Sequence, residues 1–458
     1  MKRTSRTGAI AAVAAAVALL APPVASAGTT LNGGGSSFVA NLMEKCQALY
    51  NADSSVNKNS DTVTYTATGS GTGRTNFANK LVKWAATDST YSTGAPSGFV
   101  YVPLTAGAIA MAYRLDGVTP AGSTLRLSPE TIAKIFAGQV TTWNDPVIAA
   151  DNRASVTPAK LTAALGGVTT RITKTSKGVS ITVTMSAGAR AKYKGKMVTF
   201  ARTNAAGKTS KAGGSLAIKP RLVQTLTHTT GDLYTVKVGT AAVAAIGPDP
   251  IVVGTTLGLP ALPIKVAYRS DGSGTTNNFT RYLNATSPGI WSKPANDSFT
   301  SAFPATIPTD GTFQAAKGSD GVSNYVKDNN GSITYTELSY VNERASSGVK
   351  AAAVKNNAGV YVAPTSAASG AFYANAAIDA NGVVTPDYLV VAADVYTINA
   401  IAYAIAYVAA TPENQAVRSY LSFVLGTCSP NNGPGLGYAP IAGELLTKAQ
   451  AQVAKIGA

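Results

Sequence analysis

The sequence predicts an α/β protein that carries an additional all-β domain, and three observations lead to that fold class. The chain has 458 residues, which is more than one ordinary hydrophobic core and predicts two to three domains. Three loops rich in glycine and serine each precede a helix-like segment. Residues 153–248 differ from both flanks, because there short alternating strands are separated by turn signals.

The most informative loop is the run RSDGSGTT at 269–276, which precedes a helix-like segment at 277–283. The first N–H groups of a helix have no partner inside the helix and carry partial positive charge, so an oxyanion fits there. Arg269 can add planar, bidentate donors, while Gly272 and Gly274 allow close approach of the backbone. A plain helix cap and turn is the alternative for such a run taken alone.

Two further loops of the same kind occur early in the chain. Gly33–Phe38 precedes a helix-like segment at Val39–Tyr50, and Gly69–Gly73 precedes another at Arg74–Trp84. Three such helix starts far apart in the sequence predict a ligand held by segments that converge in space. The glycine spacing fits neither the dinucleotide fingerprint nor the phosphate loop of nucleotide-binding proteins.

The order of these loops, with the turn ATDS at 86–89 after the second, resembles the phosphate-binding protein of high-affinity phosphate ABC transporters, which is a periplasmic binding protein. The resemblance continues through LSPETIAKIFAGQVTTWN at 127–144, GSITYTELSY at 331–340 and LGYAP at 436–440. It implies a type II-like fold of two α/β lobes, inorganic phosphate as the ligand and an ABC permease as the partner.

The resemblance also implies which residues hold the phosphate. Matched motif by motif, they are Ser37, Phe38, Ser70, Asp88, Arg269, Ser273, Gly274 and Thr275. Ser37 stands where threonine is usual in the family and keeps the hydroxyl group. Asp88 is followed by Ser89 and Thr90 rather than Ala-Pro, which leaves open how its turn is fixed.

The chemistry of the two aspartates suggests separate roles. A carboxylate at Asp88 repels a bound anion unless that anion still carries a proton to donate. Monohydrogen phosphate has such a proton and sulfate does not, so Asp88 is expected to reject sulfate. Asp271, two residues from Arg269, either pairs with the guanidinium and holds it in place or bonds its own backbone as a turn residue.

The expected lobes are each made of two stretches of chain. Lobe I comprises residues 28–104 and 396–458, and lobe II comprises residues 105–152 and 249–395. Residues 153–248 interrupt the resemblance as an insert that is predicted to be a small, Ig-like β-sandwich. Its expected strands lie at 180–185, 197–200, 222–227 and 233–238, with turn signals at Gly195, Gly207 and Gly213-Gly214.

Positive charge is concentrated in the insert. The chain has a net charge of +16, and residues 153–248 combine fifteen Lys or Arg residues with one acidic residue, Asp232. The insert is therefore either a solvated basic spacer or a surface that binds an anionic envelope polymer, such as a teichoic-acid-like chain or acidic lipid headgroups. Nucleic acid is disfavoured as a partner, because the chain is predicted to be exported and the insert has few aromatic residues.

Export is predicted by the first 27 residues, in which basic residues, an apolar run and an Ala-Ser-Ala site form a secretory signal peptide. The protein is expected to be secreted, periplasmic or at the cell surface, with no transmembrane span and no lipid anchor. In an oxidising compartment the two cysteines, Cys46 and Cys428, are expected to form a disulfide, and two separate buried thiols are the alternative.

An enzymatic function is disfavoured. The one histidine of the chain, His228, lies in the insert and is expected to point to solvent from a strand, so no Ser-His-Asp triad can form in the core. We expect no catalytic residue, no metal site and no cofactor. The alternative to a phosphate receptor is a surface or adhesion protein that uses the receptor fold and binds envelope polymers through its insert.

Overall fold

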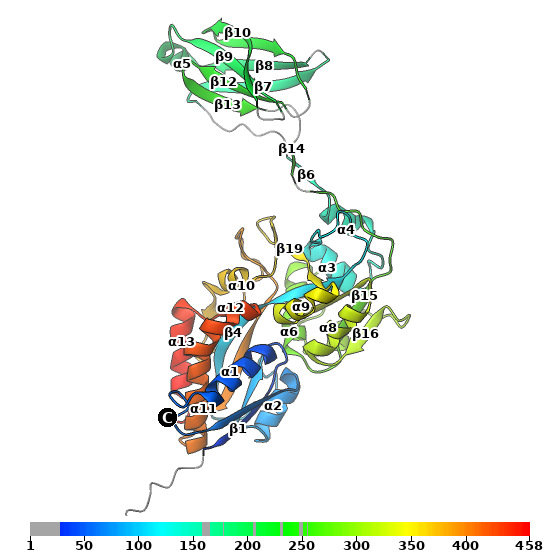
Figure 1. The fold of residues 1–458 in the computed structure, drawn as a ribbon, viewed down its shortest axis with the longest axis vertical. Helices are drawn as coiled ribbons and strands as arrows, with labels where there is room; N and C mark the ends of the chain where they lie inside the picture. Colours follow the sequence, from blue (N-terminus) through cyan, green and yellow to red (C-terminus); the bar gives the residue numbers. More distant parts are fainter. Residues whose placement is uncertain are drawn as a thin grey trace, which may run out of the picture. The chain divides into compact units, whose positions relative to one another are not determined.

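The computed structural model describes residues 28–157, 165–176, 178–204, 208–229, 232–246, 251–253 and 255–458 (Figure 1). The predicted signal peptide lies outside this range, as does the turn signal at Gly207. The chain divides into two compact units. The first contains the residues up to Arg114, Ile132–Gln139 and Lys265–Ala458, and the second contains Leu115–Thr131 and Val140–Ile264.

The first unit is built on a ten-stranded mixed sheet. Its strand order is β16 (Phe313–Ala316), β15 (Lys265–Arg269), β17 (Ser332–Glu337), β4 (Phe99–Arg114), β23 (Asn399–Tyr407), β3 (Trp84–Thr87), β1 (Thr30–Gly35) and β2 (Thr62–Ala67). The short strands β18 (Lys350–Ala351) and β24 (Tyr438–Pro440) also pair with β4.

Strand β4 joins the two halves of this sheet. Its residues Phe99–Ala108 pair with β23, and Ile109–Arg114 pair with β17, both antiparallel. The strand reads as an almost continuous apolar run and is buried between its two end residues. That pattern is expected for a central strand whose two faces are both covered by other elements.

Helices cover the sheet on both sides, which confirms the predicted α/β class (Figure 1). They are α1 (Ala40–Ala52), α2 (Ser70–Ala78), α6 (Gly274–Thr286), α7 (Phe299–Ala302), α8 (Gly318–Asp328), α9 (Leu338–Glu343), α10 (Ser366–Tyr373), α11 (Pro412–Phe423), α12 (Ser429–Leu436) and α13 (Gly443–Ala454). Helices α1 and α2 contact β1, β2 and β3, while α8 contacts β15 and β17.

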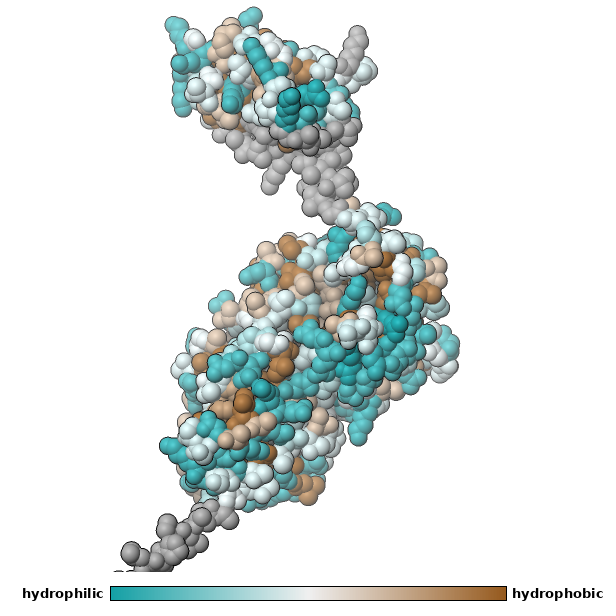
Figure 2. Space-filling view, in the orientation of Figure 1, coloured by the Kyte–Doolittle hydropathy of each residue, from teal (hydrophilic) through white to brown (hydrophobic). Residues whose placement is uncertain are grey.

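The remaining elements are short. They are β5 (Arg126–Leu127), α3 (Pro129–Phe136), α4 (Pro146–Asp151), the 3-10 turn Ala345–Ser347, β19 (Ala353–Lys355), β20 (Tyr361–Val362), β21 (Ala377–Ile378), β22 (Val384–Thr385) and a π-helical turn at Val424–Cys428. On the face seen in Figure 2, hydrophobic residues form scattered patches among hydrophilic ones. Across the described ranges, no helix is both long and apolar enough to cross a membrane.

The observed boundaries of one strand and two helices correct three expectations from the sequence. Gly33–Gly35 belong to strand β1 rather than to a loop, because they pair in parallel with β2 and β3. Glycine is required at Gly33, since a side chain there would lie only 2.2 Å from the ring of Trp84. Helix α2 begins inside the second loop, at Ser70, and ends well before Trp84, which is in β3. Helix α6 begins at Gly274, three residues earlier than expected.

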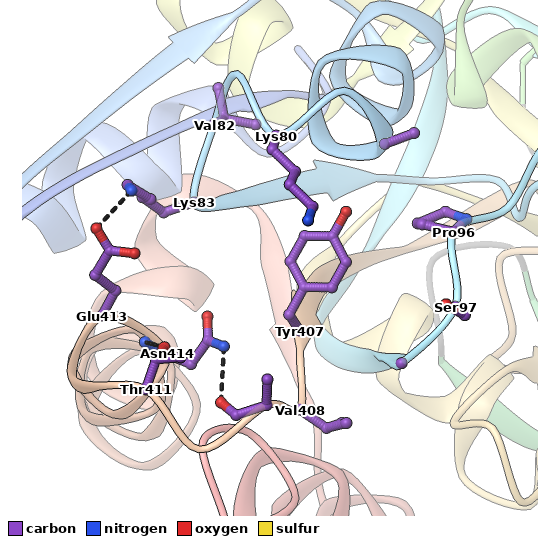
Figure 3. Close-up of a pocket in the computed structure, with 13 residues that line it drawn as sticks. Lys80, Val82, Lys83, Pro96, Ser97, Tyr407, Val408, Thr411, Glu413 and Asn414 are labelled. Atoms are coloured by element: carbon purple, nitrogen blue, oxygen red, sulfur yellow. Dashed lines mark hydrogen bonds and ion pairs between the residues drawn. The ribbon is translucent and has the colours of Figure 1, made fainter.

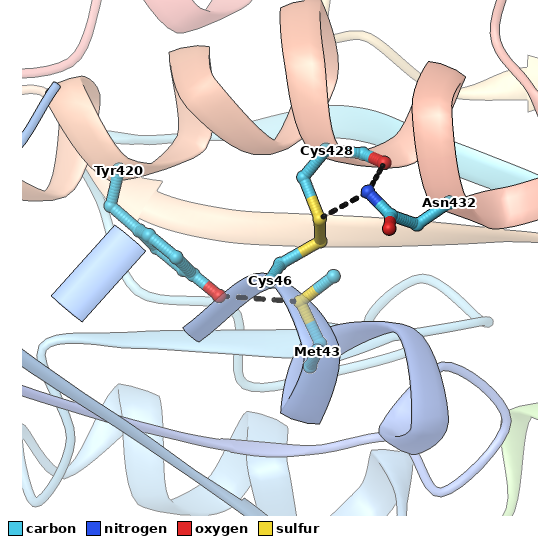
Figure 4. Close-up of a disulfide and its surroundings, with 5 residues drawn as sticks. All are labelled: Met43, Cys46, Tyr420, Cys428 and Asn432. Atoms are coloured by element: carbon cyan, nitrogen blue, oxygen red, sulfur yellow. Dashed lines mark hydrogen bonds between the residues drawn. A yellow bond between two sulfur atoms is a disulfide. The ribbon is translucent and has the colours of Figure 1, made fainter. Parts of the chain in front are cut away.

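The predicted disulfide is present (Figure 4). Cys46 on α1 and Cys428 in the π-helical turn are both fully buried, and their Cα atoms are 5.7 Å apart. The Asn432 side chain donates a hydrogen bond of 3.0 Å to the Cys428 carbonyl oxygen, and the Tyr420 hydroxyl lies 3.9 Å from the sulfur of Met43. The bridge therefore links the first helix to the C-terminal helices inside a packed interface.

Removing this bridge is expected to lower the stability of the protein substantially. Its cysteines are 382 residues apart in sequence, and closing a long loop restricts the unfolded chain strongly. We expect the double variant Cys46→Ala, Cys428→Ala to lose about 2 to 5 kcal/mol of unfolding free energy, measured by urea denaturation. Reduced wild type should fall to a similar value, and a double variant as stable as oxidised wild type would contradict this role.

The insert forms two antiparallel sheets that share one core, as the sequence predicts. One sheet has the order β10 (Thr209–Ala217), β9 (Met197–Thr203), β12 (Leu233–Val238) and β13 (Ala241–Ile246), and the other has β11 (Arg221–Leu226), β8 (Gly178–Met185) and β7 (Val168–Thr175). Alternate residues of both sheets, including Ile181, Val183, Phe200 and Val236, form the core. A short helix, α5 (Ala187–Lys192), follows β8. Strands β6 (Ser155–Thr157) and β14 (Ile251–Val253) pair at the base of the insert.

Two expectations within the insert are wrong. Gly213-Gly214 lie inside strand β10, where the pairing register shifts between Ala212 and Leu216, so the glycines mark a bulge rather than a turn. His228 does not point to solvent, because its side chain is only 5% exposed. Its Nδ1 atom lies 3.1 Å from the hydroxyl of Tyr234 and 3.9 Å from a carboxylate oxygen of Asp232.

Candidate anion-binding site

The three loops found in the sequence meet in the first unit, where strands end and helices begin. Strand β1 leads into Ser36, Ser37 and Phe38, β3 leads into Asp88, and β15 ends at Arg269. Helices α2, α6 and α8 begin at the same place, so their unpaired N–H groups converge there.

Hydrogen bonds connect the loops directly. Ser36 Oγ donates to Asp88 Oδ1 at 2.6 Å, and Ser70 Oγ donates to Asp88 Oδ2 at 3.2 Å. On the other side of the site, Ser37 Oγ lies 2.9 Å from Ser319 Oγ, and Arg269 Nη1 donates to Ser319 Oγ at 3.3 Å. The structure thus brings Ser37, Ser70, Asp88 and Arg269 together as the sequence suggests.

Of the other four predicted residues, Phe38 is fully buried and its N–H donates to Ser36 Oγ at 3.1 Å, and the start of helix α6 supplies the remaining three. Ser273 caps the helix, its side chain accepting a hydrogen bond of 3.1 Å from the N–H of Thr276. Gly274 has no room for a side chain, because a Cβ atom there would lie 2.7 Å from both Asp88 Cβ and Ser70 Oγ. The hydroxyl of Thr275 is buried and has no hydrogen-bond partner among the described residues.

Asp88 is a buried carboxyl group with 4% of its surface exposed. Burial raises its pKa to about 6, although the hydrogen bond from Ser36 and the charge of Arg269 act in the opposite direction. Asp88 is therefore mostly ionised at neutral pH and accepts hydrogen bonds.

The turn around Asp88 is fixed without the proline that is usual in the family. The Asn278 side chain donates to the carbonyl oxygen of Asp88 at 2.6 Å, and the hydroxyl of Thr87 donates to the carbonyl oxygen of Ser89 at 2.6 Å. Arg74 Nη1 donates to that Thr87 hydroxyl at 2.8 Å and to the Ser89 carbonyl oxygen at 3.0 Å. These hydrogen bonds hold the backbone of the turn in place, as a proline ring would.

Arg269 is 3% exposed and is held by Asp271. Its Nε donates to Asp271 Oδ1 at 2.7 Å and its Nη2 to Asp271 Oδ2 at 2.5 Å, which is a bidentate pair. The N–H of Gly318 also donates to Asp271 at 3.0 Å. Although burial alone raises the pKa of Asp271, the hydrogen bonds and charge of Arg269 hold it below its usual value. Asp271 thus orients Arg269, with Nη1 turned toward the serines.

Further contacts hold the two halves of the sheet together around this site. The N–H of Gly71 donates to the carbonyl oxygen of Gly272 at 2.9 Å. Arg74 on α2 forms an ion pair with Asp297. The Asn41 side chain on α1 donates to Glu343 on α9 at 2.5 Å. The site is therefore closed, and its side chains are shielded from solvent.

Ser36, Ser319 and Glu337 were not predicted as site residues. Ser36 lies directly beside Ser37 in a run already singled out, and the pair Gly318-Ser319 opens helix α8 with the same glycine-serine signal as the other loops. Glu337 lies at the end of β17, in a segment noted only for its resemblance to the family. No local pattern marks it as a member of the site.

A separate cavity of about 500 Å³ lies beside the end of α2 and the start of α11 (Figure 3). Lys83 forms an ion pair of 2.6 Å with Glu413 there, and Lys80 extends beside the ring of Tyr407. The cavity contains none of the predicted ligand residues. In the described part of the chain, no group of three or more His, Cys, Asp or Glu residues could hold a metal ion.

This fold and site define the class of two-lobed solute-binding receptors. The chain belongs to the PBP superfamily, because the profile of the PBP superfamily domain matches residues 21–230 and 161–427.

Relatives named as phosphate-binding proteins are similar in sequence. PstS 3 of Mycobacterium leprae is 43% identical over 98 residues, which are 21% of this chain and 24% of that protein. PstS 2 of Mycobacterium tuberculosis is 26% identical over 289 residues, which are 61% of this chain and 47% of that protein. The chain thus spans about half or less of the length of these relatives.

Solved structures show the same two-lobed fold. The phosphate-bound form of the high-affinity periplasmic phosphate-binding protein PfluDING has a TM-score of 0.54 at 19% identity, covering 92% of this chain and 93% of that one. The phosphate-binding protein of Stenotrophomonas maltophilia has a TM-score of 0.53 at 17% identity with the same coverage. The fold predicted from the ordered motifs is confirmed.

Proposed function

We propose that this protein binds inorganic phosphate at the site formed by Ser37, Phe38, Ser70, Asp88, Arg269, Ser273, Gly274 and Thr275. The observation that carries the proposal is the pair of opposed groups in a closed site. The guanidinium of Arg269 is turned toward serine hydroxyls on one side, and the carboxylate of Asp88 lies on the other. A tetrahedral anion that accepts several hydrogen bonds and donates one suits that arrangement.

The donors outnumber the acceptors, as an oxyanion requires. Beside Arg269, the hydroxyls of Ser37 and Thr275 and the first N–H groups of α6 can donate to anion oxygens, and the Ser70 hydroxyl can do so when it turns from Asp88 to the anion. Phe38 is fully buried and its N–H donates to Ser36 Oγ at 3.1 Å, so its contribution is the exclusion of water and the support of that loop. Asp88 then accepts the remaining proton of the bound phosphate and disfavours an anion that has none.

We further propose that the protein is exported and delivers phosphate to an ABC permease rather than catalysing a reaction. Membership of the PBP superfamily and the naming of its relatives as phosphate-binding proteins support a binding role. Export is supported by the sequence pattern of residues 1–27. The proposed lobes, residues 28–104 with 396–458 and 105–152 with 249–395, would open by hinge motion to admit the ligand.

Calorimetric titration of residues 28–458 tests this proposal. Phosphate and arsenate, which both carry a proton at neutral pH, should bind to one site, and sulfate should bind much more weakly. A surface or adhesion protein that uses the receptor fold only as a scaffold would give no heat with any of the three anions, and that result would overturn the proposal.

We propose as a second function that the insert holds the protein at anionic polymers of the cell envelope. Its one acidic residue, Asp232, is buried and paired with Arg202 at 2.6 Å, so it does not offset the surface charge. The exposed basic residues in this part of the structure are Arg153, Arg171, Lys174, Lys192, Lys194, Lys196, Lys208, Lys211, Lys219, Arg221 and Lys237. Such a surface attracts polyanions over a distance set by ionic strength.

Excision of the insert should separate the two functions. Thr157 of β6 lies opposite Ile251 of β14, so a two-residue Asn-Gly turn can replace residues 158–250 and close a hairpin. We expect the shortened protein to bind phosphate like wild type but to lose attachment to envelope material. Wild-type attachment should also fail at about 1 M salt, where the Debye length is roughly 3 Å. Attachment that resists both changes would make the insert a spacer, and lost phosphate binding would make it part of the receptor.

A further inference from the structure

Glu337 is a buried carboxyl group at the edge of the anion site. It is the last residue of β17 and is only 1% exposed. Its Oε2 accepts a hydrogen bond of 3.2 Å from the hydroxyl of Thr336, whereas its Oε1 is buried with no hydrogen-bond partner in the described part of the chain. An ionised carboxylate with an unpaired oxygen is costly at such a position, so a neutral acid is favoured.

The groups that face Glu337 come from four other elements. They are Arg269 at the end of β15, Asp88 after β3, Tyr340 on α9 and Tyr438 on β24. Arg269 is the cation of this set, and its charge is already engaged by Asp271. Burial raises the pKa of Glu337 to about 8 and the charge of Asp88 acts in the same direction, although the hydrogen bond with Ser319 and the charge of Arg269 act in the opposite direction. Glu337 is therefore mostly protonated at neutral pH and has a proton to donate.

Two serine hydroxyls lie between Glu337 and the position proposed for the ligand. The hydroxyl of Ser319 faces the Glu337 carboxyl and lies 2.9 Å from Ser37 Oγ. Ser319 Oγ also accepts from Arg269 Nη1, and the N–H of Ser319 donates to Ser37 Oγ at 3.2 Å. Each hydroxyl has a single proton to donate, so the direction of one hydrogen bond fixes the direction of the next.

We propose that Glu337 is a positioning residue of the phosphate site, whose carboxylic acid fixes the Ser37 hydroxyl as a donor to the bound anion. The neutral acid donates to Ser319, Ser319 donates to Ser37, and the proton of Ser37 is left for the ligand. When Glu337 is ionised, Ser319 donates to it instead and Ser37 donates to Ser319. The anion then loses a donor and faces an additional negative charge.

This inference rests on the proposed phosphate binding and adds a pH dependence to it. The acid form is the binding form, and it is lost as pH rises through the pKa of about 8. Most free phosphate is monohydrogen phosphate at pH 7.5 and nearly all of it is at pH 9, so its own ionisation changes little over this range and would strengthen, not weaken, binding of that form. Because only the form with a protonated Glu337 binds well, the dissociation constant for monohydrogen phosphate should rise about tenfold between these two pH values.

Calorimetric titration with phosphate at pH 7.5 and 9 tests the inference on residues 28–458. Wild type should weaken about tenfold, whereas Glu337→Gln, which stays neutral and can donate from its amide, should change less than twofold. Glu444→Gln on α13, an exposed glutamate outside the site, should keep the wild-type change. At pH 8.5, titrations in two buffers of different ionisation enthalpy should show proton uptake by wild type and less by Glu337→Gln.

Equal pH profiles for wild type and Glu337→Gln would overturn the role of Glu337 while leaving phosphate binding intact. Absence of phosphate binding by wild type at both pH values would instead overturn the proposed function and this inference with it. If Glu337→Gln does not fold, Ser319→Ala supplies the test, because it cuts the path between Glu337 and Ser37. It should weaken binding several-fold at pH 7.5, and wild-type affinity with the wild-type pH profile would contradict the proposal.

Discussion

Replacing Arg269 with alanine is expected to weaken phosphate binding by about 2 to 5 kcal/mol, which is roughly thirtyfold to several thousandfold in the dissociation constant. The guanidinium is buried and forms a bidentate pair with Asp271, so its loss removes donors to the anion. It also leaves the Asp271 carboxylate buried without its partner, close to the bound negative charge.

The lysine variant separates charge from geometry at this position. Arg269→Lys keeps the positive charge but loses the planar fork, so its affinity should lie between those of wild type and Arg269→Ala. Arg418→Ala, on helix α11 outside the site, serves as the control and should bind like wild type. All variants can be compared by calorimetric titration with phosphate. Unchanged affinity in Arg269→Ala would remove this residue from the site.

Replacing Asp88 with asparagine is expected to reduce the preference for phosphate over sulfate by about 2 to 3 kcal/mol, or roughly thirty- to a hundredfold in the ratio of dissociation constants. The carboxylate can only accept hydrogen bonds at neutral pH, so an oxygen of sulfate placed against it would be unpaired and repelled. An asparagine amide can donate to that oxygen. Titration of both proteins with both anions at pH 8 measures the ratio.

The pH dependence of sulfate binding gives an independent check on Asp88. Burial raises the pKa of this carboxyl to about 6, so the acid form, which can donate to sulfate, becomes populated as pH falls through that value. Sulfate affinity of wild type should therefore rise below pH 6, and that of Asp88→Asn should rise less. Asp310→Asn, an exposed aspartate outside the site, should behave like wild type. Sulfate binding as tight as phosphate binding in wild type at pH 8 would contradict the role of Asp88.

Much of the fold could be predicted because it is indicated by short local patterns or by motifs that follow one another in a fixed order along the chain. Alternating residues located the strands of the insert, since one face of each strand packs into a shared core. The pairing of Arg269 with Asp271 could be expected from their spacing of two residues. The bridge between Cys46 and Cys428 could be expected from an even number of cysteines in an exported protein.

The features that were predicted wrongly or not at all depend on contacts between residues that are distant in the sequence. The glycines at 33–35 suggested a loop, but parallel pairing with the distant strands β2 and β3 makes them part of β1. His228 looked exposed in the sequence, although Asp232 and Tyr234 enclose it in the fold. Glu337 could not be recognised, because its burial and its neighbours Arg269 and Asp88 come from separate elements. The ligand roles of the eight site residues and the lobe boundaries stay predictions.

A crystal structure of residues 28–458 grown with saturating phosphate is the most direct test of phosphate binding at this site. We predict one tetrahedral anion between Arg269 and Asp88, with oxygens within hydrogen-bond distance of Ser37, Ser70 and the first N–H groups of α6. Its one protonated oxygen should face the Asp88 carboxylate. Phosphate found instead in the separate cavity beside Lys80 and Lys83, or an empty site at saturating phosphate, would contradict phosphate binding between Arg269 and Asp88.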